Sequence, residues 1–156
     1  MANPFAMSPT FHKIGHVTNT MGWRVFPTPN GLAVITTTGR KSGKARHRAV
    51  RAMRSGDYVY AVAMFGQRCD WVHNIRANPD VRIKLGSKSY DAVARELGAD
   101  ERQQASDAYL KLAGWFDYVD YANLNWSLPT REKISRLHAE WFERGTPVVF
   151  HVQSSA

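Results

Sequence analysis

The feature that most constrains the fold is a short apolar stretch that runs directly into a glycine-bracketed turn. Residues 32–36 read Leu-Ala-Val-Ile-Thr, and residues 36–46 read Thr-Thr-Thr-Gly-Arg-Lys-Ser-Gly-Lys-Ala-Arg. Apolar and β-branched residues favour a buried strand, and the glycines favour a tight reversal into a second strand over residues 46–54. The sequence therefore predicts a hairpin whose turn carries concentrated positive charge.

The predicted turn and the strand after it contain no acidic residue. Seven of the chain's 21 Lys and Arg residues lie between positions 40 and 54: Arg40, Lys41, Lys44, Arg46, Arg48, Arg51 and Arg54. Backbone N–H groups of a Gly-rich turn, together with Lys and Arg, bind phosphate or carboxylate groups. The glycine spacing differs from the Walker A loop and from the dinucleotide fingerprint, which argues against an ATPase or a Rossmann protein.

Composition narrows the class of protein. The chain has 156 residues, 44% of them hydrophobic and 22% charged, as in an ordinary globular domain. Its net charge of +8 at pH 7 indicates an anionic partner, which is a small polyanion, a nucleic acid or a membrane surface. The single Cys69 excludes an intrachain disulfide. Cys69 and His73 have the spacing of one helical turn, but no second pair of metal ligands lies near them in the sequence, which argues against a metal site. We expect a cytoplasmic protein without a metal, and peripheral membrane contact stays open.

The rest of the pattern predicts one mainly β domain over residues 1–156. Further strands are expected over residues 58–65, 81–85, 88–97 and 147–152. Helices are expected over 71–78, capped by Asp70, and over 100–113, capped by an Asp100–Gln103 pair. A further helical segment is expected as an insertion over 122–145, with a helix that begins at Thr130 and ends at Gly145. Residues 1–31 read as an irregular arm with a short helix near 11–21. About six strands with short turns predict an α+β fold whose strands close into a small barrel.

Three blocks of sequence carry a resemblance to a known family. They are the turn at residues 36–46, Trp-Val-His-Asn-Ile-Arg-Ala-Asn-Pro-Asp-Val at 71–81, and Arg-Gly-Thr-Pro-Val-Val-Phe at 144–150. In order and spacing they resemble the deazaflavin-dependent nitroreductases, also described as F420H2-dependent quinone or nitro reductases. The resemblance implies a split β-barrel related to folds that bind flavin mononucleotide, and it implies coenzyme F420, whose phosphodiester and glutamate tail suit a cationic loop.

The resemblance also implies roles for individual residues. The phosphate and tail would contact Arg40, Lys41, Ser42, Arg46, His47 and Arg48, with Val50 and Arg51 continuing that wall. The deazaflavin ring would lie against Val62, Ala63, Met64 and Phe65. The start of the short helix would face the ring or phosphate through Asp70, Trp71, Val72, His73 and Asn74. Strand alternation means that His47 and Arg48 cannot both face one ligand.

The expected chemistry is hydride transfer from the reduced coenzyme to a planar, electron-poor substrate. Such a reaction needs a donor for the developing oxyanion, and Tyr118 and Tyr121 are the catalytic candidates, with Trp115 beside them. Aromatic core packing is the alternative role of these tyrosines. Met64 stands where nitro-reducing members often have a serine, so an enone (activated alkene) or a quinone is favoured over a nitro compound.

Two other functions remain open from the sequence. The basic hairpin over residues 40–54 would also suit a nucleic-acid-binding protein, although no recognised nucleic-acid motif accompanies it. A split-barrel protein could also bind a cofactor without turnover. The favoured interpretation is that the protein is an F420H2-dependent reductase with a small conjugated substrate and no nucleic-acid partner, and that it acts as a monomer or a homodimer.

Overall fold

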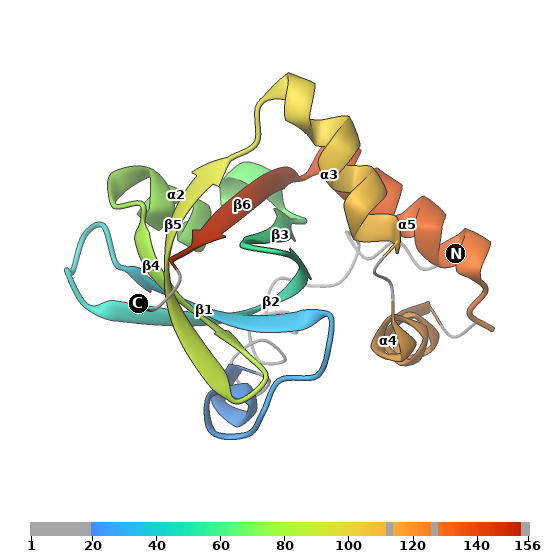
Figure 1. Ribbon diagram of the computed structural model, residues 1–156, viewed down its shortest axis with the longest axis horizontal. Helices are drawn as coiled ribbons and strands as arrows, with labels where there is room; N and C mark the ends of the chain where they lie inside the picture. Colours follow the sequence, from blue (N-terminus) through green and yellow to red (C-terminus); the bar gives the residue numbers. More distant parts are fainter. Residues whose placement is uncertain (1–19, 112–113, 126–127, 154–156) are drawn as a thin grey trace.

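The centre of the molecule is a closed antiparallel barrel. The computed structural model describes residues 20–111, 114–125 and 128–153. The barrel has the strand order β1-β2-β3-β6-β5-β4 (Figure 1). Its strands are β1 (Leu32–Thr38), β2 (Ala45–Ser55), β3 (Tyr58–Ala63), β4 (Asp80–Leu85), β5 (Lys88–Glu96) and β6 (Thr146–Val152). The expected α+β barrel is confirmed, and closure leaves no strand edge exposed.

Alternation along the strands separates two cores. Inward-facing side chains such as Ile35, Ala61 and Phe150 fill the barrel, each of them fully buried. Helix α2 (Asp70–Ala77) adds Trp71, Val72 and Ile75 to this interior core. The Trp71 ring stacks on Phe150 with their centroids 6.5 Å apart. Because α2 contributes its apolar face to the barrel's own core, it is fixed relative to β1 and the hairpin turn that follows it.

A second core lies outside the barrel. Helices α3 (Ala99–Lys111) and α5 (Arg131–Arg144) pack on one another, and α5 lies against β3 and β6. The shared buried residues include Tyr109, Trp141 and Phe142. Helix α4 (Trp115–Asn125) packs against α5, and Figure 1 shows all three helices on the same side of the barrel. No helix within the described ranges has both the length and the apolar character needed to cross a bilayer.

The N-terminal segment is attached to the outside of the barrel. Residues 20–25 are helical, so the short helix expected near 11–21 overlaps a helix that ends at residue 25, while residues 1–19 lie outside the described residues. Thr20 Oγ1 accepts the Ala49 backbone N–H at 3.0 Å. Lys84 Nζ donates to the carbonyls at the end of this helix, those of Trp23, Arg24 and Phe26, at 2.9–3.0 Å. A lysine at this position satisfies carbonyls that have no partner within the helix.

The local sequence patterns predict most helices and strands correctly, but the predicted ends of several of them differ from the structure. β3 stops at Ala63 rather than 65, because a turn and the 3₁₀ segment Gly66–Arg68 follow it. The residue that caps α2 is Cys69, so Asp70 is the first helical residue. Helix α5 begins as expected, since Thr130 Oγ1 accepts the Lys133 N–H.

Two further expectations need correction. The predicted Asp100–Gln103 capping pair does not form: Glu101 accepts the Gly98 N–H, and Gln103 donates to Asp107. The segment over 122–145 is not one helix. It contains the end of α4 and the whole of α5.

Replacing Lys84 with Met tests how the N-terminal helix is held. The change keeps the apolar stem and removes three charge-assisted hydrogen bonds, so we expect a loss of about 1.5 kcal/mol in stability. Amide hydrogen exchange should accelerate over residues 20–26 and stay unchanged in β6. Lys88→Met, at an exposed position on the same hairpin, is the control. Equal exchange in both variants would show that the Lys84 contacts do not hold the helix.

Candidate functional site

The cationic loop, residues 39–46 from the end of β1 to the first residues of β2, is organised by its own backbone. Gly39 N–H donates to the Lys44 carbonyl at 2.8 Å, and the Ser42 and Gly43 N–H groups donate to the Gly39 carbonyl. The Lys44 N–H reaches Ser42 Oγ at 3.4 Å, and the Arg40 N–H reaches Asn74 Oδ1 at 3.2 Å. These N–H groups are already used within the protein. The expected anion-binding role of the turn's backbone is therefore restricted to the donors that remain, and exposed Lys and Arg side chains supply the positive charge.

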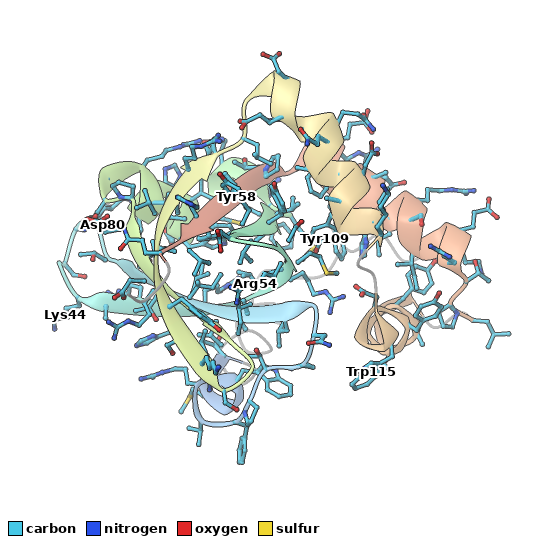
Figure 2. The ribbon with its side chains drawn as sticks, viewed as in Figure 1. Lys44, Arg54, Tyr58, Asp80, Tyr109 and Trp115 are labelled. Atoms are coloured by element: carbon cyan, nitrogen blue, oxygen red, sulfur yellow. The ribbon has the colours of Figure 1, made fainter. Side chains whose placement is uncertain are left out.

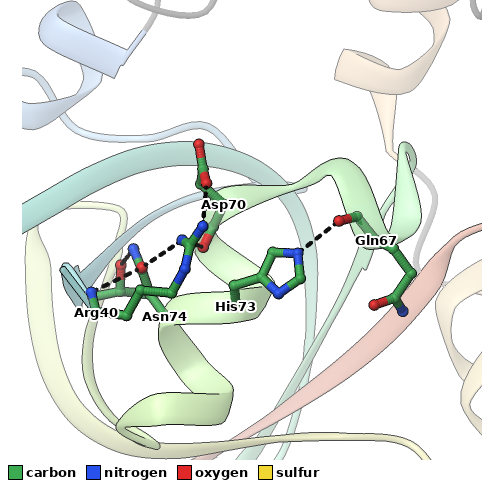
Figure 3. A network of polar contacts seen from close by, with 6 residues as sticks. Arg40, Gln67, Asp70, His73 and Asn74 are labelled. Atoms are coloured by element: carbon green, nitrogen blue, oxygen red, sulfur yellow. Dashed lines mark hydrogen bonds and ion pairs between the residues drawn. The ribbon is translucent and has the colours of Figure 1, made fainter.

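Helix α2 holds Arg40, the first positively charged side chain of the loop. The Arg40 guanidinium pairs with Asp70 Oδ1 at 3.0 Å and donates to Asn74 Oδ1 at 3.2 Å (Figure 3). Asn74 is buried and donates its own N–H to Thr37 Oγ1 at 3.1 Å. One amide therefore joins β1, the cationic loop and α2. Of the expected site residues, the structure brings Arg40, Asp70 and Asn74 into direct contact.

The remaining loop cations have no acidic partner. Among the described residues, Lys41, Lys44 and Arg46 form no ion pair, and all three are exposed. The Arg46 guanidinium contacts Ser42 Oγ at 3.4 Å. Side chains that carry unpaired charge are available to an anionic ligand. Lys44 belongs to this group and was missed as a site residue, although it lies in the same acid-free run.

Strand β2 divides its side chains between two faces, as alternation predicts. Arg48 lies toward Cys69 and Asp70; burial lowers the pKa of its guanidinium, and these two neighbours oppose that shift. His47 lies on the other face, where its Nδ1 is 2.9 Å from Thr36 Oγ1. Burial, and then the nearby Arg24, lower the pKa of His47 below its usual 6.5. His47 is therefore neutral at pH 7, and the positive charge of this region comes from lysine and arginine.

The start of α2 differs from a simple anion site. Asp70 occupies its first turn with an 84% exposed carboxylate, which already balances the positive end of the helix dipole. Trp71 and Val72 are buried in the barrel core. His73 makes a 2.7 Å hydrogen bond between its Nε2 and the Gln67 carbonyl oxygen (Figure 3). Burial raises the pKa of the Cys69 thiol, which disfavours the reactive thiolate.

The residues expected to line a planar ring lie at and beyond the end of β3. Val62 and Ala63 are buried in the outer and inner cores respectively, and Val50 is buried in the inner core. Met64 and Phe65 are only partly buried, and they pack against the outer and inner cores. Of this group, Met64 and Phe65 are the side chains that retain exposed apolar surface. They follow the strand in a turn, where a flat ligand can approach them.

The aromatic candidates lie on α4, away from the cationic loop. Figure 2 places Lys44 and Trp115 at opposite ends of the molecule. Tyr118 is half-buried, and its hydroxyl makes no hydrogen bond to any residue that the structure describes. Tyr121 is buried, which agrees with the alternative role of an aromatic residue that packs in the core. Tyr118 is thus the better placed of the two to meet a ligand.

Arg51 does not continue the wall formed by Arg46 and Arg48. It lies on the opposite face of β2 and forms an ion pair with Asp117 of α4. His138 Nε2 of α5 is 3.3 Å from Asp117 Oδ1, and both side chains are almost fully buried. Sequence reasoning missed this cluster, because nothing in the spacing of residues 51, 117 and 138 links them.

The arrangement fits an elongated ligand with one anionic end. Three exposed cations of the cationic loop, at the start of β2, have no acidic partner among the described residues: Lys41, Lys44 and Arg46. A phosphodiester with a carboxylate tail would match the loop cations, and a planar apolar ring would match Met64 and Phe65. In the described part of the chain, no three His, Cys, Asp or Glu side chains gather as a metal site would require.

Comparisons with known proteins agree with this geometry. The sequence profile of the F420H(2)-dependent quinone reductase family matches residues 13–131. A curated F420H(2)-dependent quinone reductase of Mycobacterium tuberculosis strain H37Rv is 35% identical over 80 residues, which are 49% of this chain and 53% of that protein. The chain thus aligns with about half the length of the curated relatives it matches.

Solved structures show the same relationship. An F420-H2 dependent reductase superposes with a TM-score of 0.51 and 26% identity, covering 79% of this chain and 94% of the other. A structure described as a domain-swapped dimer superposes with a TM-score of 0.53 and 25% identity, covering 92% and 94%. Since the family profile covers most of the chain, this protein belongs to the F420H(2)-dependent quinone reductase family.

Proposed function

We propose that this protein is a reductase that binds reduced coenzyme F420 and transfers a hydride to a quinone. The observation that carries the proposal is the cationic loop, whose Lys41, Lys44 and Arg46 have no acidic partner within the described part of the chain, in a protein of this family. A quinone is preferred to a nitro compound because Met64 and Phe65 offer apolar surface without a hydroxyl group. An enone is the second substrate class that this surface suits.

The coenzyme, when bound, would supply the hydride, which carries both electrons, and the protein supplies position and charge. In the proposed reaction the quinone gains the hydride and one proton, which gives the hydroquinone and the oxidised coenzyme. The protein must therefore hold the anionic tail, keep the ring and the quinone in contact, and donate a hydrogen bond to the quinone oxygen that becomes negative.

The proposed anion clamp consists of Lys41, Ser42, Lys44 and Arg46. These side chains extend from a loop that Asn74 and Arg40 fasten to α2. A fixed loop reduces the side-chain and backbone entropy that binding would otherwise cost. Arg48 lies one step further along the same strand face and would extend the clamp, whereas Arg40 is already engaged by Asp70.

Tyr118 is the proposed hydrogen-bond donor to the substrate. Its hydroxyl is uncommitted among the described residues, and its half-buried position partly shields it from water. A phenol O–H group can donate a hydrogen bond to an oxygen that becomes negative. The proposal predicts that reduced F420 is oxidised upon addition of a quinone, in anaerobic mixing followed by absorbance. Absence of oxidation above the rate without protein would contradict it.

Arg46→Ala tests the anion clamp. The variant loses one charge-assisted contact, and we expect the Kd for oxidised F420 to rise about tenfold, equivalent to ~1.4 kcal/mol. Fluorescence titration measures the Kd. Arg82→Ala is a matched control, because Arg82 is an exposed strand arginine paired with Asp91 on a different part of the barrel. Equal affinity in both variants would remove Arg46 from the clamp.

Tyr118→Phe tests the proposed donor. The phenyl ring preserves packing and removes the hydroxyl, so kcat for quinone reduction should fall at least tenfold while the Kd for F420 stays within about twofold. Tyr58→Phe is the control, since that ring is exposed and stacks on His151. An unchanged kcat in Tyr118→Phe would leave that residue with a packing role only.

A further inference from the structure

A buried charged cluster joins the barrel to the helical layer. Asp117 Oδ1 contacts a guanidinium nitrogen of Arg51 and lies 3.3 Å from His138 Nε2. Asp117 Oδ2 accepts the Gly114 N–H at 2.8 Å. The Asp117 side chain is only 1% exposed and that of Arg51 is 10% exposed. The carboxylate therefore has partners from β2, from α5 and from the start of its own helix.

This cluster determines where α4 lies. Among the described ion pairs, Arg51–Asp117 is the one that connects α4 with the barrel. A buried carboxylate is costly without hydrogen-bonded, charged partners, and removal of one partner leaves the other charge uncompensated. Displacement of α4 from β2 would separate Asp117 from Arg51. The helix is consequently held at the position where both Arg51 and His138 can reach Asp117.

The chain before β1 covers the same cluster. Gly31 has φ +88°, and a Cβ at that position would lie 3.8 Å from both Arg51 Nη2 and Asp117 Oδ2. It would also lie 3.6 Å from Met53 Cε. The left-handed backbone favours glycine here, and the neighbouring atoms show that this segment lies in van der Waals range of the ion pair. A chain segment packed over the ion pair reduces the access of water to it and so strengthens the attraction between the two charges.

Tyr118 is the residue after Asp117. Successive residues of a helix are turned by about 100° around its axis, so Tyr118 points roughly a quarter turn away from Asp117 and moves with it when α4 shifts. We propose that Asp117, held by Arg51 and His138, is a positioning residue that sets the location of Tyr118 for quinone reduction. This inference rests on the proposed function. The cluster is separate from the cationic loop, so its role concerns the substrate side and not coenzyme affinity.

Asp117→Asn tests this role because it keeps the shape of the side chain and removes its charge. Hydrogen exchange over residues 114–125 should accelerate at least tenfold. The kcat for quinone reduction should fall at least tenfold, and the Kd for oxidised F420 should stay within about twofold. Asp91→Asn is the matched control, since Asp91 pairs with Arg82 in an exposed ion pair. That control should leave all three quantities unchanged.

The double variant Arg51→Gln with Asp117→Asn separates positioning from general destabilisation. Two carboxamides can hydrogen-bond without a buried net charge, so we expect slower exchange over 114–125 and at least threefold higher kcat than in Asp117→Asn. A double-mutant cycle quantifies this coupling. If Asp117→Asn does not fold, a folded double variant with protected α4 supports the pairing, and a double variant that is equally unfolded contradicts it.

Other outcomes would overturn the inference. Wild-type exchange and wild-type kcat in Asp117→Asn would show that the cluster does not position α4. A loss of F420 affinity as large as the loss of kcat would show that the cluster acts through the coenzyme site. If the wild-type protein oxidises no reduced F420 with a quinone, the proposed function fails and the catalytic part of this inference fails with it. The exchange measurement would then still decide whether the ion pair holds α4.

Discussion

The candidate site depends on the buried amide of Asn74. Its oxygen accepts from Arg40, and its N–H group donates to Thr37, so it joins α2, the cationic loop and β1. Asn78, one helical turn later, extends a weaker contact of 3.5 Å to Thr38. A buried amide must use its donors and acceptor, which gives these contacts a fixed geometry. The loop is consequently a rigid support from which Lys41, Lys44 and Arg46 extend.

Electrostatics divides the arginines of this region into two groups. Arg40 and Arg51 are held by Asp70 and Asp117, and they contribute to structure. Arg46 has no acidic partner among the described residues, and its charge remains available to a ligand. The same residue type, within one acid-free run of sequence, thus serves both purposes. Which purpose it serves depends on whether a carboxylate from a distant element reaches it.

Much of the fold could be predicted from the sequence because its signals are local. Alternation and turn residues identified six strands, and Thr130 and Gly145 marked the limits of α5. The Cβ that Gly145 lacks would lie 2.7 Å from the Ala63 carbonyl oxygen of β3, so the end of α5 can approach that strand closely.

The candidate site was harder to predict, because its contacts join residues that are distant in sequence. Arg51 pairs with Asp117 of α4, which is 66 residues away, and Asp117 in turn contacts His138 of α5, a further 21 residues along the chain. The sequence also does not show that N–H groups of the loop already have acceptors within the protein, because composition does not reveal which donors are paired.

The measurement that tests the central claim most directly is a fluorescence titration of the purified protein with oxidised F420, at low and at moderate salt, with flavin mononucleotide as competitor. The account predicts saturable binding that weakens as salt increases, because the clamp is formed by exposed cations. It also predicts that flavin mononucleotide does not displace the coenzyme. Absence of saturable binding, or full displacement by flavin mononucleotide, would contradict the claim that this cationic loop serves coenzyme F420.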